Sequence, residues 1–195
     1  MLFFKKIKGN LVHKTAVINW KNISIGKNNI IGPYVVIGNI AQYPKVKSNG
    51  KIVIGDNNVF NEYCNIHLPT KIKKETLIGS NNYFMNSTTI DHDCTIENNI
   101  ILSSNVILGG NVHIMNGSQV GMRVSIHQNQ VIGSFSMIGM SSIITKRLSV
   151  LPGYTYYGKP AKKKRKNIIG LKRNKINKLK LKNELNRFLK LKSLI

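Results

Sequence analysis

Residues 91–144 read, in blocks of six, DHDCTI ENNIIL SSNVIL GGNVHI MNGSQV GMRVSI HQNQVI GSFSMI GMSSII. Every block ends on a bulky apolar residue, and the same period runs back to Ile54 and forward to Val150. A period of six fits neither the 3.6 residues of a helical turn nor the strict alternation of a half-buried strand. An internal repeat of this length instead indicates a stacked, repetitive architecture.

The remaining positions of each block predict short strands joined by tight turns. The residue directly after the apolar position is often Gly, and Asn and Asp cluster there, as in Asp56-Asn57-Asn58. Gly and Asn tolerate the left-handed backbone that a tight turn needs. Three blocks make one triangular coil, with the large residue of each block pointing into a prism. Cys64 and Cys94 fall on small inward positions, so we expect buried thiols without a redox role.

The repeat is interrupted twice before it ends. The step from Ile37 to Ile54 is not a multiple of six, so residues 39–53 are predicted to leave the prism as a loop. The polar stretch 67–76 keeps the period but is predicted to bulge. Residues 1–157 are therefore expected to form the prism with its loops.

Residues 158–195 are expected to form a basic linker and a C-terminal helix. Pro160 marks the linker, and a helix is predicted from about Ile168 to Leu194. Four apolar residues of that helix share one face at helical spacing and are expected to pack on the prism wall: Leu181, Leu185, Phe188 and Leu189. Contact with a membrane surface is the alternative for this helix.

The charge of the chain is concentrated in this last segment. The 195 residues carry 30 Lys and Arg against 7 Asp and Glu, a formal charge of +23. From Lys159 onward there are 15 Lys and Arg and a single acidic residue, Glu184, so the prism is only mildly basic. Phe188 is the only aromatic residue there, and a nucleic-acid site would interleave aromatics with the positive charges. No nucleic-acid partner is expected.

Composition excludes several other classes. At 42% hydrophobic residues the chain can bury a core, so wholesale disorder is excluded. No apolar run reaches the roughly 18 residues of a spanning helix, and the N-terminus does not read as a signal peptide. Two cysteines exclude a disulfide scaffold. A cytoplasmic protein is the expectation.

His92 is the first candidate for chemistry. It falls at a turn position with Asp93 beside it, and a carboxylate next to His fixes the tautomer of a general base. Counting three blocks onward leads to Gly110, and three more lead to Gln128, each one coil further along. A glycine next to a base offers an unhindered backbone N–H to an oxyanion. The alternative for His92 is a solvated turn histidine.

The hexads resemble those of the left-handed parallel β-helix acyltransferases, a handedness that departs from the usual right-handed crossover. Within that superfamily, the segments IGDNNVFNEYCNIH, IGSNNYFMNSTTIDHDCTI, SIHQNQVIG and NIIGLKR are similar to the acyltransferases that begin lipid A synthesis. Those enzymes acylate the 3-hydroxyl of UDP-N-acetylglucosamine from acyl carrier protein. The resemblance implies an all-β left-handed prism with a C-terminal helix, a homotrimer, and active sites between neighbouring prisms.

The resemblance also implies site residues. The general base matches His92, its orienting carboxylate Asp93, and the oxyanion amide Gly110. The positions of the contacts to the sugar and the nucleotide match Gln42, Lys45, His67, Asn111, His127, Gln128, Asn167 and Arg173. Arg suits a phosphate because its charged fork binds two oxygens at once. No bound cofactor and no metal are implied, only a thioester cosubstrate on acyl carrier protein or CoA.

Four positions depart from that family. Tyr43 stands where the family has a sugar-binding Asp, Asn111 where it has a substrate-contacting His, and Ile169 where it has a nucleotide-contacting Glu. Met140 stands where long-chain enzymes have a Gly at the end of the acyl channel. A Met there would fill the channel, which implies a short to medium acyl group.

Two rival hypotheses use the same prism. The DHDC motif followed by Gly158-Lys159-Pro160-Ala161 also resembles the acetyl-CoA-dependent N- and O-acetyltransferases of nucleotide amino sugars for surface polysaccharides. A metal enzyme like the γ-type carbonic anhydrases needs three histidines that meet across an interface. His92, His113 and His127 do not repeat the close pair expected there, so no metal is expected.

Overall fold

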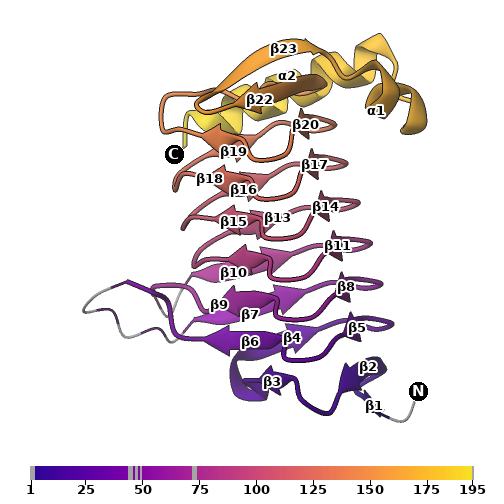
Figure 1. The fold of residues 1–195 in the computed structure, drawn as a ribbon, viewed down its shortest axis with the longest axis vertical. Coiled ribbons are helices and arrows are strands. Elements are labelled where there is room, and N and C mark those ends of the chain that lie inside the picture. Colours follow the sequence, from indigo (N-terminus) through magenta and orange to yellow (C-terminus); the bar gives the residue numbers. More distant parts are fainter. Residues whose placement is uncertain (1–2, 44–45, 47, 49, 72–73, 195) are drawn as a thin grey trace.

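The computed structural model describes residues 3–43, 46, 48, 50–71 and 74–194. Short strands form three sheets, which are the walls of a tall triangular prism (Figure 1). Consecutive strands visit the walls in turn, so each pairs with the strand one coil away. Thr89, for example, pairs in parallel with Ile107, which lies three blocks further along the chain. This register is the predicted coil of three hexads.

The strands of each wall have the following bounds. The first wall holds β1 (Phe4–Ile7), β2 (Asn10–His13), β5 (Ile30–Ile31), β8 (Val59–Phe60), β11 (Tyr83–Phe84), β14 (Ile101–Leu102), β17 (Gln119–Val120), β20 (Met137–Ile138), β22 (Tyr154–Gly158) and β23 (Ala161–Lys166). The second holds β4 (Ile23–Ile25), β7 (Lys51–Ile54), β10 (Glu75–Ile78), β13 (Thr95–Ile96), β16 (His113–Ile114) and β19 (Val131–Ile132). The third holds β3 (Val17–Ile18), β6 (Val36–Asn39), β9 (Asn65–His67), β12 (Thr89–Ile90), β15 (Ile107–Leu108), β18 (Ser125–Ile126) and β21 (Ile143–Ile144). A short 3-10 helix, Trp20–Asn22, precedes β4.

The core fills the axis of the prism. The inward residues of the hexads are 0–3% exposed: Ile54, Phe60, Ile66, Ile78, Phe84, Ile90, Ile96, Leu102, Leu108, Ile114, Val120, Ile126, Ile132, Ile138, Ile144 and Val150. Burying one such side chain stabilises the fold by about 1.5–3 kcal/mol. Ile72, which the period also predicts to point inward, lies outside the described residues.

The turns take the backbone that their composition predicts. Many non-glycine residues have a positive φ, mostly at one repeated position of the hexad; Asn57, Asn81 and Asn99 have φ of 57–60°. A buried ladder of asparagine side chains also ties successive coils together. Asn58 Nδ2 donates to Asn29 Oδ1 (2.9 Å), and Asn58 Oδ1 accepts from the backbone N–H of Asn82 (3.0 Å).

Two loops leave the prism next to each other. The chain departs between β6, which ends at Asn39, and β7, which begins at Lys51; it departs again between β9, which ends at His67, and β10, which begins at Glu75. Residues 51–53, predicted as loop, are paired strand because Lys51–Ile54 continues the ladder to Glu75–Ile78. Both loops project from the same side of the prism (Figure 1), and the backbone of Gly50 lies against Pro69 and Lys71.

The C-terminal region differs from the prediction in two ways. The predicted linker is a strand, because the chain turns back after Gly158 and β23 pairs antiparallel with β22. Its lysines are exposed, and charge along an outer strand discourages further pairing. The predicted single helix is two helices, α1 (Ile168–Arg173) and α2 (Lys178–Lys192). The break occurs where Asn174 ends α1 and the side chain of Asn177 caps α2.

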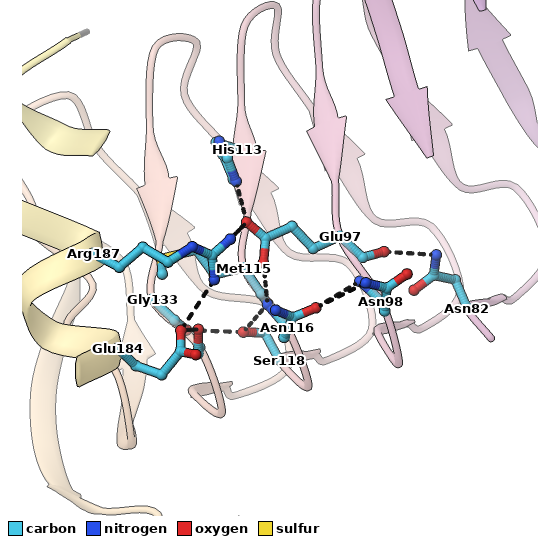
Figure 2. A network of polar contacts seen from close by, with 11 residues as sticks. Asn82, Glu97, Asn98, His113, Met115, Asn116, Ser118, Gly133, Glu184 and Arg187 are labelled. Atoms are coloured by element: carbon cyan, nitrogen blue, oxygen red, sulfur yellow. Dashed lines mark hydrogen bonds and ion pairs between the residues drawn. The ribbon is translucent and has the colours of Figure 1, made fainter. Parts of the chain in front are cut away.

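Helix α2 packs against the prism through part of the predicted face. Phe188 is 1% exposed and contacts Met115 and Val131, whereas Leu185 and Leu189 are exposed. A polar cluster that we call the Glu97 network holds the same helix (Figure 2). No helix in the described part of the chain is both long enough and apolar enough to cross a membrane.

The Glu97 network joins the prism to α2. Glu97 Oε1 accepts from His113 Nε2 (2.6 Å) and pairs with Arg187, while Oε2 accepts from the backbone N–H of Asn116 (3.0 Å). Arg187 also binds Glu184 (3.1 Å), which accepts from Ser134 Oγ (2.5 Å). Figure 2 shows Arg187 and Glu184 of the helix converging with Glu97 of the prism.

Candidate active site

The column predicted by counting three blocks at a time exists in the structure. His92, Gly110 and Gln128 occupy the same turn position on three successive coils, at the edge between the third and second walls. The backbone N–H of Asn111 donates to the carbonyl of His92 (2.8 Å), and that of Asn129 donates to Gly110 (3.0 Å). The coil register therefore stacks these residues without any side-chain contact being required.

His92 and Asp93 form a hydrogen-bonded pair. His92 Nδ1 lies 2.8 Å from Asp93 Oδ2, and the two side chains are 12% and 6% exposed. Burial alone raises the pKa of the Asp93 carboxyl, but hydrogen bonds from Thr70 and His92 outweigh it and hold that pKa below its ordinary value. Asp93 therefore stays ionised at neutral pH and can orient the imidazole.

Gly110 approaches the imidazole face so closely that only glycine fits. A Cβ at this position would overlap the ring of His92. The amides on either side are already used, because Gly109 donates to Ile126 (2.9 Å) and Asn111 to His92 (2.8 Å). The Gly110 N–H, by contrast, donates to no backbone carbonyl of the described residues. That amide is a suitable donor to a developing oxyanion beside the base.

A cavity of about 320 Å³ lies over this column. Its floor is the column itself, and its roof comes from the two loops. The lining residues are Tyr43, Val46, Thr70, Lys71, Lys74, His92, Asp93, Gly110, Asn111, Gln128 and Asn129. The ring of Tyr43 stands edge-on to that of His92, with 5.9 Å between their centres, and Lys74 Nζ lies 4.0 Å from Asp93 Oδ2. The cavity thus joins the His-Asp pair to two lysines.

Three of the predicted substrate contacts, His67, Gln42 and His127, do not line this cavity, and a fourth, Lys45, is not described by the structure. His67 is 3% exposed at the end of β9, with Nδ1 3.5 Å from Asp91 Oδ1 and without a hydrogen-bond partner among the described residues. Burial lowers the pKa of His67, and Asp91 opposes that shift. Gln42 and His127 are exposed, and Lys45 lies outside the described residues.

The predicted nucleotide and acyl residues lie elsewhere on this chain. Asn167 caps α1 and lines a second cavity of about 600 Å³ together with Met137, Arg165 and Ile169. Arg173 is exposed at the end of α1, and Met140 is 66% exposed in the turn after β20. A single chain does not bring these residues to His92.

Sequence reasoning missed three loop residues that line the roof of the cavity, Thr70, Lys71 and Lys74. Thr70 donates a hydrogen bond of 2.7 Å to Asp93 Oδ2, and Lys71 and Lys74 lie beside it. Only the polar composition of residues 67–76 pointed to this segment, and it does not indicate which side chain reaches Asp93. Among the described residues, no group of three or more His, Cys, Asp or Glu side chains is arranged to hold a metal ion.

Comparison with known proteins identifies relatives by sequence. No family model matches the chain. The chain is 31% identical over 154 residues to the acyl-[acyl-carrier-protein]–UDP-N-acetylglucosamine O-acyltransferase of Gloeothece citriformis, a match that covers 78% of this chain and 55% of the relative. The enzyme of the same name from Burkholderia lata is 35% identical over 151 residues, a match that covers 76% of this chain and 57% of the relative.

Solved structures decide the family. The UDP-N-acetylglucosamine acyltransferase of Bacteroides fragilis superposes with a TM-score of 0.82 at 30% identity, over 91% of this chain and 69% of that one. The Arabidopsis UDP-N-acetylglucosamine acyltransferase superposes with a TM-score of 0.79 at 29% identity. This match covers 90% of this chain and 68% of the Arabidopsis chain. This chain belongs to the UDP-N-acetylglucosamine acyltransferase family. The resemblance, and the left-handed parallel β-helix that it implied, are thereby confirmed.

The match to the UDP-N-acetylglucosamine acyltransferases covers only part of their length. The chain spans little more than half of the curated relatives, 55% and 57% of the two above.

Proposed function

We propose that this chain transfers an acyl group from acyl carrier protein to a hydroxyl of a nucleotide-linked hexosamine such as UDP-N-acetylglucosamine. The observation that carries the proposal is the His92–Asp93 pair with Gly110 packed closely against the imidazole, all three lining one cavity. The names of the relatives support the donor and the acceptor. The proposed reaction uses no bound cofactor and takes place in the cytoplasm.

The chemistry follows from the tautomer of His92. Asp93 accepts a hydrogen bond from Nδ1–H, so Nε2 carries the lone pair that takes the proton of the attacking hydroxyl. The hydroxyl oxygen bonds to the thioester carbonyl carbon, and the resulting oxyanion accepts the Gly110 N–H. Collapse breaks the carbon–sulfur bond, and the leaving thiolate receives the proton from the imidazolium. General base catalysis supplies about 10²–10⁴-fold and one oxyanion donor about 10²–10³-fold.

The complete site is proposed to form between copies in a homotrimer. Asn167 and Arg173 lie away from His92 on one chain, so a neighbouring prism would have to bring them to the nucleotide. Arg173 would bind phosphate through its fork, and the 15 Lys and Arg from Lys159 onward would attract an acidic carrier protein. His67, Gln42, Lys45, Asn111 and the His127-Gln128 pair are proposed as further contacts to the acceptor.

Met140 supports a short to medium acyl group. Met122 and Met140 occupy equivalent turns on successive coils, where the N–H of Ser141 donates to Met122 (2.7 Å), and both methionine side chains are exposed. Because a neighbouring prism would cover this edge, the two side chains would fill space that an extended acyl chain needs. Met140→Gly is expected to shift the preferred donor toward longer chains.

A second candidate is acetyl transfer from acetyl-CoA to a nucleotide amino sugar. It is favoured by the turn Gly158-Lys159-Pro160-Ala161, which joins β22 to β23 next to four exposed lysines and an arginine. The cations suit the phosphates of CoA. The base, the oxyanion amide and the trimer would be the same, so only donor and acceptor separate the two candidates.

One experiment tests both. The full chain is incubated with acyl carrier protein thioesters of graded length, and separately with acetyl-CoA, against UDP-N-acetylglucosamine and UDP- or dTDP-amino sugars. Product masses identify donor and acceptor. His92→Ala should abolish transfer, while His13→Ala, a histidine bonded to Thr15 near the N-terminus, should not. Full activity of His92→Ala would reject the mechanism, and acetyl-CoA as the only working donor would favour the second candidate.

A further inference from the structure

A threonine from a loop that leaves the prism touches the carboxylate of the His-Asp pair. Thr70 lies in the loop between β9 and β10, and its Oγ1 donates to Asp93 Oδ2 (2.7 Å). Its backbone N–H donates to the other oxygen, Asp93 Oδ1 (3.2 Å). Thr70 is distant from Asp93 in the sequence, so the loop, and not the turn of His92 itself, supplies both contacts.

These contacts fix the direction in which Asp93 points. Oδ2 accepts from both Thr70 and His92 Nδ1, and the backbone N–H of Asp93 donates to Thr76 Oγ1 (3.2 Å). A carboxylate that is held at both oxygens cannot rotate to present a different edge to the imidazole. Hydrogen bonds to an ion are also roughly twice as strong as those between neutral groups.

We propose that Thr70 is a positioning residue for catalysis: it holds Asp93 so that Asp93 holds the His92 ring in the tautomer and direction that expose Nε2 to the acceptor hydroxyl. This inference rests on the proposed function, because it assigns Thr70 to the base of that reaction. It links the loop over the cavity to the base beneath it. Thr70 itself touches no reacting atom.

A purely structural role for Thr70 makes a different prediction. In that case the residue would only tie the loop to the prism, and its backbone N–H would suffice. Thr70→Val removes the hydroxyl, preserves the shape and keeps the N–H, whereas Thr70→Ser keeps both donors. The two substitutions therefore separate the hydroxyl from the loop attachment.

The kinetic test compares these two variants of the full chain with Thr95→Val, the same substitution on the outer face of β13 away from the cavity lining. We expect Thr70→Val to lower kcat about tenfold with little change in KM, since a misdirected base loses part of its roughly 10²–10⁴-fold contribution. Thr70→Ser should recover most of the rate. Unchanged kcat in Thr70→Val, or an equal loss in Thr70→Ser, would overturn the proposal.

A second measurement does not depend on turnover. Nitrogen-15 NMR of the free protein reports which ring nitrogen of His92 carries the proton. We expect the Nδ1–H form in wild type and Thr70→Ser, and a mixture of tautomers in Thr70→Val; identical spectra in all three would overturn the inference. If wild type transfers no acyl group from any donor, the proposed function fails, while the spectra still decide whether Thr70 positions the ring.

Discussion

His92 Nδ1 and Asp93 Oδ2 are 2.8 Å apart although the two residues are neighbours in the chain. Adjacent side chains of an extended strand point to opposite faces. Asp93 instead has a φ of 61°, and this left-handed turn backbone lets both side chains meet on one edge of the prism. The repeat that builds the turns therefore also builds the pair.

Asp93→Asn should remove most of the activity without unfolding the chain. An amide can donate its own proton to Nδ1 and so favours the tautomer in which Nε2 is already protonated. We expect kcat to fall by about 10²–10⁴-fold. Asp56→Asn, a turn carboxylate on a different edge, is the matched control. A loss of less than threefold in kcat at saturating substrate would contradict the role given to Asp93.

Gly110→Ala should destabilise the protein through one contact. The new methyl group would overlap the His92 ring, and overpacking of this kind costs about 1–3 kcal/mol. In a His92→Ala background the ring is gone, so the same substitution should cost much less. Urea unfolding of both single variants and the double variant, at one protein concentration, gives the coupling energy. Additive losses would indicate that the two residues do not touch.

The hexads account for the walls, the core and the His92 column, but not for the roof of the cavity. Counting whole coils of three blocks from His92 leads to Gly110 and Gln128, because each coil repeats the register of the last. Thr70 and Lys74 belong to the polar stretch 67–76, which keeps the period and was predicted only to bulge. Their contact with Asp93 depends on how the loop folds back, which no local pattern encodes.

The C-terminal region was harder to predict for a similar reason. Strand β23 consists mostly of lysine and shows no apolar alternation, so its pairing with β22 has no signal in the sequence. The helix break is encoded locally, since Asn177 precedes α2 and caps it through Lys180 N–H (2.8 Å). The four apolar residues from which a single helix was predicted all lie beyond that cap, in α2.

The two cysteines should be unreactive in the folded protein. Burial raises the pKa of Cys64 and of Cys94 to about 12, and only the thiolate is a good nucleophile. A thiol reagent at pH 8 is expected to label neither residue in the native state and both after denaturation. Rapid labelling of the native protein would show that the prism opens at these positions.

Glu97→Gln should weaken the attachment of α2 in a pH-dependent way. Burial alone raises the pKa of Glu97, but the hydrogen bond and charge of His113 and the charge of Arg187 outweigh it and lower that pKa. A carboxyl with a lowered folded-state pKa stabilises the fold above its unfolded value, about 4.3, and this contribution is lost as the pH falls through the folded value. Wild type should therefore be the more stable protein at pH 7, by about 1–3 kcal/mol.

The difference between wild type and Glu97→Gln should shrink as the pH is lowered below the unfolded-state pKa, because the protonated carboxyl then resembles the amide. Urea unfolding from pH 7 to pH 3 measures it, and Glu75→Gln, an exposed carboxyl on β10, is the control that should show little difference at any pH. Breaking the network should also free α2, so proteolysis near residues 184–187 should accelerate first in Glu97→Gln. A stability difference that stays constant across the whole range would mean that Glu97 acts through packing and not through its charge.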